Sequence, residues 1–175
     1  MWTAKERCVG DQNKANLKRA SEPTRLRDGE CILDIQNYVP FLLSATSNAW
    51  QRRTSAYYRA RLGVGIVEWR ILSMLNIEPG ITANRICEVI RMDKSAVSRT
   101  LKSLSEREML CFETSEKDPR KRRWWLSESG IKKHNEVLPA ALGHEGILIE
   151  SIDPEDLEVF LKVIRKMLVN IDPRD

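Results

Sequence analysis

The stretch DKSAVSRTLKSLSEREML, Asp93 to Leu110, decides the fold that this chain of 175 residues predicts. Its apolar residues Val97, Leu101 and Leu104 recur at the spacing of one helical face, which predicts a buried stripe. Asp93 stands immediately before this pattern, in the position where an aspartate caps the N-terminus of a helix. The opposite face carries short polar and cationic side chains, so we expect an exposed helix with one basic surface.

The residues on either side of this helix predict the motif to which it belongs. Upstream, ITANRICEVI (residues 81–90) has Thr82 as an N-cap and predicts a short helix, and only the pair RM separates that helix from Asp93. Two short helices joined by a tight turn resemble a helix-turn-helix. Downstream, the alternation in LCFETS (residues 110–115), a charged loop and RRWWL (residues 122–126) predict a β-hairpin, and this order defines a winged helix-turn-helix.

The hairpin has a basic tip beside two tryptophans. KDPRKRR, residues 117–123, contains five basic residues and one acidic residue, which predicts a wing tip near DNA phosphates or in a minor groove. Adjacent strand residues face opposite ways, so one of Trp124 and Trp125 should pack beneath the wing while the other faces water or another element. Core packing is favoured over base stacking, because a duplex offers no unpaired base.

The exposed face of the central helix has the side chains that a major groove requires. Close approach needs small residues, hydroxyls suit phosphates or base edges, and an arginine suits guanine O6 and N7. Ser95, Ser98, Arg99 and Lys102 supply these groups. The alternative is a surface helix whose charges only face water, but the short capped helix before it and the basic hairpin after it favour DNA.

At these residues the chain resembles the MarR (multiple antibiotic resistance regulator) family of bacterial transcription factors. The family's wing motif, Asp-x-Arg, then a Leu-Thr pair and a Gly, is matched by Asp118-Pro119-Arg120, Leu126-Ser127 and Gly130, with Ser in place of Thr. The resemblance covers roughly residues 32–171, and it implies that Asp118 orients Arg120, which enters the minor groove. Glu108 departs from the family, since many members have Gly where the recognition helix ends. The residues predicted to contact DNA are Thr82, Ser95, Ala96, Ser98, Arg99, Lys102, Asp118, Arg120, Lys121 and Arg122.

The pattern along the whole chain predicts a mainly α fold with a small β-hairpin wing. We expect a flexible polar arm at 1–29, an N-terminal helix at 30–62, the winged lobe at 63–127 and C-terminal helices at 128–175. The resemblance implies a homodimer formed by the outer helices. The stripe Leu157, Phe160, Leu161, Ile164 and Leu168 supports this, because it exceeds what one small winged domain can cover. Two-fold symmetry then predicts a pseudo-palindromic operator.

The resemblance also implies a small effector, often an aromatic acid or phenolic compound, bound between the dimerisation helices and the DNA-binding lobe. Trp50, Arg53, Tyr57 and Arg61 lie at i, i+3, i+7 and i+11 on one predicted helical face, and Arg70 is a further candidate on the next helix. Aromatic walls with cationic ends suit a planar anion or an acyl-coenzyme A thioester. The alternative is that these long side chains only cover a neighbouring helix.

Composition excludes several other classes. No apolar run approaches the roughly 18 residues of a membrane span, and the N-terminus is polar, so we expect a soluble cytoplasmic protein. The chain has no Gly-rich phosphate loop, no Ser/His/Asp set and no metal-spaced cysteines, so we expect no enzyme activity, cofactor or metal. The predicted function is a ligand-responsive DNA-binding regulator, in the usual case a repressor. A thiol-based redox sensor and a winged-helix protein-interaction module are the alternatives.

Overall fold

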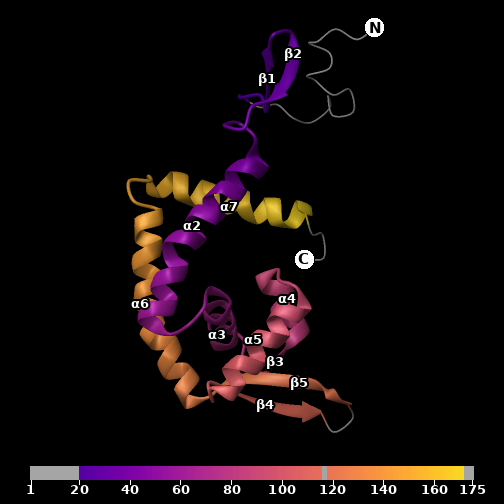
Figure 1. Ribbon diagram of the computed structural model, residues 1–175, viewed down its shortest axis with the longest axis vertical. Helices are drawn as coiled ribbons and strands as arrows, with labels where there is room; N and C mark the ends of the chain where they lie inside the picture. Colours follow the sequence, from indigo (N-terminus) through magenta and orange to yellow (C-terminus); the bar gives the residue numbers. More distant parts are fainter. Residues whose placement is uncertain (1–19, 116–117, 172–175) are drawn as a thin grey trace. The chain divides into compact units, whose positions relative to one another are not determined.

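The computed structural model describes residues 20–115 and 118–171, and within those ranges the chain forms six helices and five strands (Figure 1). The chain divides into two compact units, Met1–Tyr57 and Tyr58–Asp175, and the boundary lies inside one long helix. In the described ranges, every helix is too short or too polar to cross a membrane.

The described part of the first unit opens with a β-hairpin. Its strands are β1 (Thr24–Arg27) and β2 (Glu30–Leu33), and Arg27 pairs with Glu30. The turn therefore consists of Asp28 and Gly29, whose φ angles are 54° and 80°. Two successive positive φ angles are typical of a type I′ turn, and Asp-Gly is a preferred sequence for that turn. The hairpin thus forms where the local turn chemistry favours it.

This hairpin corrects the predicted boundary between a flexible arm at 1–29 and a helix at 30–62. Residues 24–27 and 30–33 are strands, and the helix α2 (Val39–Leu62) begins well after residue 30. Pro40 is consequently the second residue of α2, where its missing N–H leaves no helical hydrogen bond unmade. The Asp28-Gly29 turn favours a hairpin here, although the apolar residues around Ile32 have helical spacing. Residues 1–19 of the predicted arm lie outside the described part of the chain.

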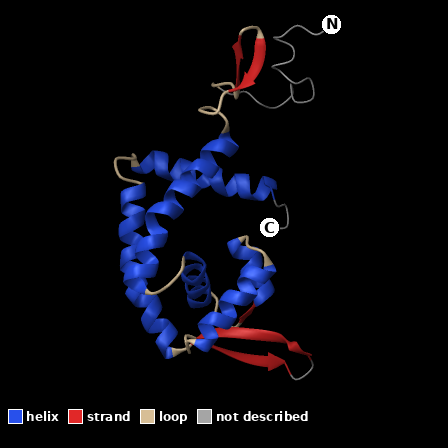
Figure 2. Ribbon diagram, viewed as in Figure 1, coloured by secondary structure: helices blue, strands red, loops and turns tan. Residues whose placement is uncertain are grey.

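The second unit holds the winged helix-turn-helix. After the end of α2 come α3 (Ile66–Ile77), β3 (Ile81–Thr82), α4 (Ala83–Ile90), α5 (Lys94–Glu106), β4 (Leu110–Ser115), β5 (Asp118–Leu126), α6 (Glu128–Leu148) and α7 (Pro154–Ile171). One antiparallel sheet has the strand order β3-β5-β4 (Figure 2). Helices α4 and α5 are the helix-turn-helix, and the β4–β5 hairpin is the wing. The predicted fold class is confirmed.

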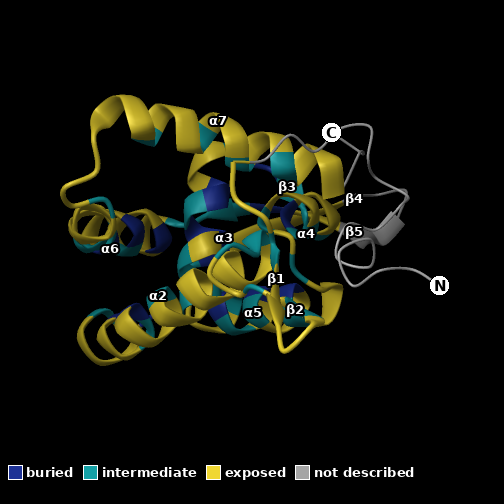
Figure 3. Cartoon of the chain, turned by 90° about the horizontal axis from the view of Figure 1, so that it is seen from above, coloured by how far each residue is buried: buried dark blue, intermediate teal, exposed yellow. Residues whose placement is uncertain are grey.

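The core of the second unit lies where α3 meets α4, α5 and the wing. The fully buried side chains of this unit are Val64, Ile71, Leu72, Leu75, Ile86, Val97, Leu101, Leu104 and Val137. Three of them, Val97, Leu101 and Leu104, are the predicted stripe of α5, which is confirmed. Figure 3 shows the contrast with α7, on which no residue is buried.

The start of α6 is fastened to the turn that follows α5. The Ser127 N–H donates to the Met109 carbonyl at 3.0 Å, and the Ser127 hydroxyl donates to the Glu108 carbonyl at 2.6 Å. The same hydroxyl accepts the Gly130 N–H at 3.1 Å and so caps the helix. A Cβ at Gly130 would lie 2.1 Å from the Met109 carbonyl oxygen, so only glycine fits there. Ser127 and Gly130 of the wing motif therefore have structural roles.

The end of α5 uses a backbone conformation that normally favours glycine. Glu108 has a φ of 56°, and the Met109 N–H reaches back to the Leu104 carbonyl at 3.0 Å. This is the hydrogen bond of a Schellman-type helix end. The helix therefore closes as it would with a glycine at this position, but a residue with a Cβ must adopt the left-handed region.

Candidate nucleic-acid interface

The joint between α4 and α5 is closed by local hydrogen bonds. Thr82 caps α4 by accepting the Arg85 N–H, and Arg91 ends it in the left-handed region with a φ of 53°. Asp93 caps α5, since its Oδ1 accepts the Ser95 hydroxyl at 2.6 Å and the Ala96 N–H at 2.8 Å. The hydrogen bond from the Ser95 hydroxyl makes the largest contribution, and that from the Ala96 N–H the next largest, to lowering the pKa of the Asp93 carboxyl below its usual value.

The cap changes what the predicted contacts Ser95 and Ala96 can offer. The Ser95 hydroxyl and the Ala96 N–H both donate to the Asp93 carboxylate, so neither hydrogen is available to DNA in this arrangement. The Ser95 oxygen, on an exposed side chain, can still accept a hydrogen bond. The main task of this pair in the structure is therefore to hold the beginning of α5.

The other end of α5 is anchored to α3 and to the loop before it. The guanidinium of Arg107 contacts Glu68 Oε1 at 2.9 Å and donates to the Gly63 carbonyl at 2.8 Å. Glu68 Oε2 also accepts the Gly65 N–H at 2.7 Å, which caps the start of α3. The Arg107 contacts at one end, together with the buried stripe Val97, Leu101 and Leu104, therefore fix the direction in which the exposed face of α5 points.

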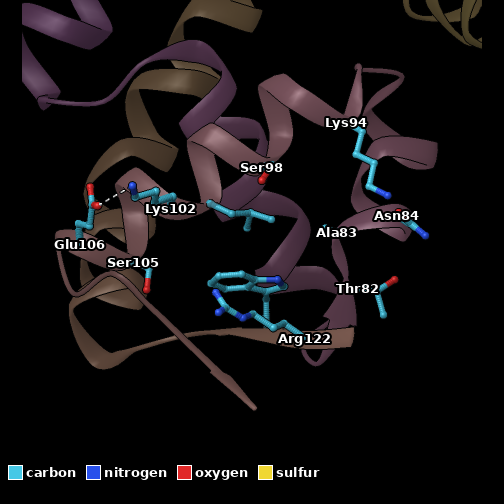
Figure 4. A pocket seen from close by; sticks show the side chains of 11 residues that line it. Thr82, Ala83, Asn84, Lys94, Ser98, Lys102, Ser105, Glu106 and Arg122 are labelled. Atoms are coloured by element: carbon cyan, nitrogen blue, oxygen red, sulfur yellow. Dashed lines mark ion pairs between the residues drawn. The ribbon is translucent and has the colours of Figure 1, made fainter. Parts of the chain in front are cut away.

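That exposed face borders a hollow of about 970 Å³ between the helix-turn-helix and the wing. Its lining comes from four elements, β3, α4, α5 and β5, and consists of Thr82, Ala83, Asn84, Lys94, Ser98, Leu101, Lys102, Ser105, Glu106, Arg122 and Trp124. Figure 4 shows Lys94 and Asn84 near one end of the hollow, Lys102 and Glu106 near the other, and Arg122 on the wing side. Four predicted DNA contacts, Thr82, Ser98, Lys102 and Arg122, are thus brought together.

The polar and cationic side chains on the exposed face of α5 separate into two stripes. Lys94, Ser98 and Lys102 repeat every four residues and line the hollow. Ser95 and Arg99 are exposed but do not line it, so they lie on the neighbouring stripe of the helix. A hollow with cationic walls suits the phosphate backbone, whereas the Arg99 stripe is free to meet base edges.

The charges around the hollow are mainly positive. Lys94, Lys102 and Arg122 are cationic, and Glu106 is the anionic side chain among its lining residues. Lys102 Nζ lies 3.7 Å from Glu106 Oε1, but these side chains are 78% and 65% exposed. An ion pair so open to water is worth little, so Lys102 can exchange it for a phosphate at low cost.

The wing places its aromatic residues as the alternation of strand residues predicted. Trp124 is 5% exposed and belongs to the core, with its ring centroid 5.0 Å from that of Phe112. Trp125 is half-buried on the other face, where its ring would lie 2.9 Å from a Cβ at Gly80. The prediction that one tryptophan packs beneath the wing is confirmed. Arg122 extends over the Phe112 ring, with Cζ 4.3 Å from the centroid.

Several predicted residues are not brought into this interface. The side chains of Asp118, Arg120 and Lys121 lie outside the described part of the structure, so their roles stay predictions. Of the predicted effector residues, Trp50, Arg53 and Tyr57 belong to the first unit, and Arg61 and Arg70 to the second. Trp50 is half-buried and the others are exposed, and their common pocket also stays a prediction.

Sequence reasoning missed several residues of the interface. Lys94 lies four residues before Ser98 and eight before Lys102, so the helical period alone could have identified it. Ser105 and Glu106 lie just beyond on the same helix. Asn84 and Phe112 carry no such signal, because they join the interface only through the packing of α4 and the pairing of the wing strands.

The cysteines and other metal-binding side chains form no metal centre in the described residues. His, Cys, Asp and Glu there form no group of three or more that could hold a metal ion. Cys87 and Cys111 carry free thiols, and burial raises the pKa of the Cys87 thiol. Cys31 is disulfide-bonded.

Comparison with known proteins finds a family match in the lobe that holds the helix-turn-helix and the wing. A model described as MarR family matches residues 62–123, which include the helix-turn-helix and most of the wing. No curated protein matches the chain.

Solved structures share the fold over most of the chain. A MarR/EmrR family transcriptional regulator from Acinetobacter sp. ADP1 has 24% identity and a TM-score of 0.74, over 81% of this chain and 99% of that one. MepR of S. aureus, in a complex with DNA, has 20% identity and a TM-score of 0.67, over 75% and 96% of the two chains. BpsR of Bordetella bronchiseptica, studied for the regulation of its DNA binding by 6-hydroxynicotinic acid, has 17% identity and a TM-score of 0.68, over 74% and 97%. The resemblance predicted from the sequence is confirmed.

Proposed function

This chain matches the MarR family of transcriptional regulators, which are not enzymes, and we propose that it is a ligand-responsive repressor. In this proposal it binds a pseudo-palindromic operator as a homodimer. A small aromatic acid, a phenolic compound or an acyl-coenzyme A thioester releases it from the operator.

The observation that carries the proposal is the hollow between α5 and the wing. Lys94 and Lys102 line one wall and Arg122 lines the other, so cationic side chains border the space on both sides. Ser98, Asn84 and Thr82 add hydrogen-bonding groups around it. A sugar-phosphate strand supplies the anionic oxygens that such a surface binds. With the backbone held there, the adjoining stripe of α5 meets base edges, and Arg99 is the residue that we assign to a guanine.

The dimer is supported by apolar surface that the described part of one chain leaves uncovered. On α7, Val159 is 59% exposed, Phe160 53% and Leu168 48%. Leu157, Leu161 and Ile164 of the predicted stripe are half-buried. A second copy that covers this surface places two recognition helices on one duplex, which is why we expect a pseudo-palindrome.

The effector class rests on the side chains of α2 and on one structural neighbour. Trp50, Arg53, Tyr57 and Arg61 repeat along α2, and Arg70 is exposed on α3. Aromatic and cationic groups suit a planar carboxylate. The BpsR structure concerns an effect of 6-hydroxynicotinic acid, an aromatic acid, on DNA binding, and we extend that class of effector to this chain as a proposal.

Two other functions were predicted as alternatives. Redox sensing through Cys87 is disfavoured, because a raised pKa reduces the reactive thiolate. A protein-interaction module would not require the three cations that surround the hollow.

Fluorescence anisotropy tests the proposal. The full chain is titrated into a labelled duplex from its own upstream promoter and into a scrambled duplex, at two salt concentrations. We expect tighter, salt-sensitive binding to the promoter, abolished by one member of a panel of aromatic acids and coenzyme A thioesters. Equal and weak binding to both duplexes would contradict operator recognition, and binding that every compound leaves intact would contradict the effector class.

A further inference from the structure

We propose that Phe112 is a positioning residue for DNA binding, whose ring holds the guanidinium of Arg122 at the hollow so that Arg122 binds a backbone phosphate. This inference rests on the proposed DNA-binding function. It assigns a task to an aromatic side chain that the sequence placed only in a strand.

The contact follows from the register of the wing. Phe112 is paired with Trp124, and Arg122 lies two residues before Trp124 on the same strand. Residues two apart on a strand share a face, and a diagonal neighbour across an antiparallel pair is within reach of long side chains. The Arg122 Cζ consequently lies 4.3 Å from the Phe112 centroid, within the range of a cation–π interaction.

The ring is itself held from below. Its centroid is 5.0 Å from that of Trp124, which is 5% exposed and part of the core, while Phe112 is 40% exposed. Arg122, Phe112 and Trp124 therefore form a continuous row of contacts that leads from solvent to the core. Because the ring already restricts the side chain of Arg122, this arginine loses less conformational entropy when it binds a ligand.

A ring contact leaves the arginine able to bind phosphate. The guanidinium presents its flat face to an aromatic ring, whereas its N–H donors lie in its plane and point away from it. Those donors can form a bidentate pair with a phosphate while the ring contact persists. Lys102 differs, because its ammonium lies beside the Glu106 carboxylate, whose negative charge opposes the approach of a phosphate. The ring thus positions the guanidinium of Arg122 while leaving its N–H donors available for a phosphate.

The test is a double-mutant cycle in the full chain, with anisotropy on the promoter duplex and on a random duplex. Phe112→Leu keeps an apolar side chain but removes the π face, and we expect binding to both duplexes to weaken about two- to fivefold. Phe112→Tyr restores the ring and should bind within error of the original chain. In an Arg122→Ala background, Phe112→Leu should have no further effect. Circular dichroism and thermal unfolding of each variant show whether the fold is retained.

The outcomes separate this inference from the function on which it rests. If the unmutated chain binds neither duplex, the proposed function fails and the inference fails with it. If the unmutated chain binds DNA but Phe112→Leu weakens binding equally with and without Arg122, the ring acts independently of Arg122 and the inference is overturned. The inference also fails if folded Phe112→Leu binds as well as the original, or if folded Phe112→Tyr binds as weakly as the leucine variant.

Discussion

Replacing Gly130 with alanine should destabilise the protein, although glycine is ordinarily the worse residue inside a helix. Gly130 lies in the first turn of α6, directly against the turn that ends α5. A Cβ there would stand 2.1 Å from the Met109 carbonyl oxygen and 3.4 Å from the Leu126 Cβ. Helix and turn would have to separate by about 0.9 Å before the first contact reached 3.0 Å, which real Cβ atoms rarely go below.

The size of the effect comes from two opposing terms. Overpacking of this kind costs about 1–3 kcal/mol, and contact with a rigid backbone carbonyl places Gly130→Ala at the upper end. The gain in helix propensity returns about 1 kcal/mol. We therefore expect the free energy of unfolding to fall by about 2 kcal/mol, which moves the midpoint of urea unfolding down by roughly 1 M.

Gly143 provides a matched control in the same helix. A Cβ at Gly143 would meet no atom within 4 Å, so only the propensity term applies. Gly143→Ala should raise the free energy of unfolding by about 0.5–1 kcal/mol. Urea titrations followed by far-ultraviolet circular dichroism, at one protein concentration, measure both variants. If Gly130→Ala proved as stable as Gly143→Ala, the close contact with Met109 would not exist and the reasoning would be refuted.

Further predictions concern the helix ends and the DNA surface. Glu108→Gly should raise the free energy of unfolding by about 1 kcal/mol because it removes a left-handed residue with a Cβ, whereas Glu108→Ala should give no such gain in the same urea titration. The depressed pKa of Asp93 contributes stability that is fully present above pH 3.8 and is lost as the pH falls through the lower folded-state pKa, so Asp93→Asn should flatten the pH dependence of thermal unfolding below that pH. Lys102→Ala should reduce the slope of the logarithm of the binding constant against the logarithm of the salt concentration by roughly 0.9, the value expected for the loss of one phosphate contact. Arg99→Ala should instead relax preference at one base position, and equal losses on promoter and random duplexes would contradict its assignment to a base.

The sequence was sufficient for the features whose causes are local. Thr82 and Asp93 were predicted as helix caps, and each accepts a backbone N–H at the start of its helix. Caps and buried stripes depend on residues within one or two turns, so periodicity and side-chain chemistry reveal them. The hairpin at residues 24–33 was also within reach, because Asp28-Gly29 is a local turn signal that the helical spacing obscured.

What the tertiary structure decided depends on elements far apart in the chain. The hollow joins Asn84, Lys94 and Arg122, from α4, α5 and β5. Their meeting depends on how α4 and α5 pack and on the register of the sheet, which no local pattern specifies. Gly130 is a clear case, since its place in the family motif was readable from the sequence. Glycine is required there because the Met109 carbonyl lies too close for any Cβ, and this contact exists only once α6 packs against the end of α5.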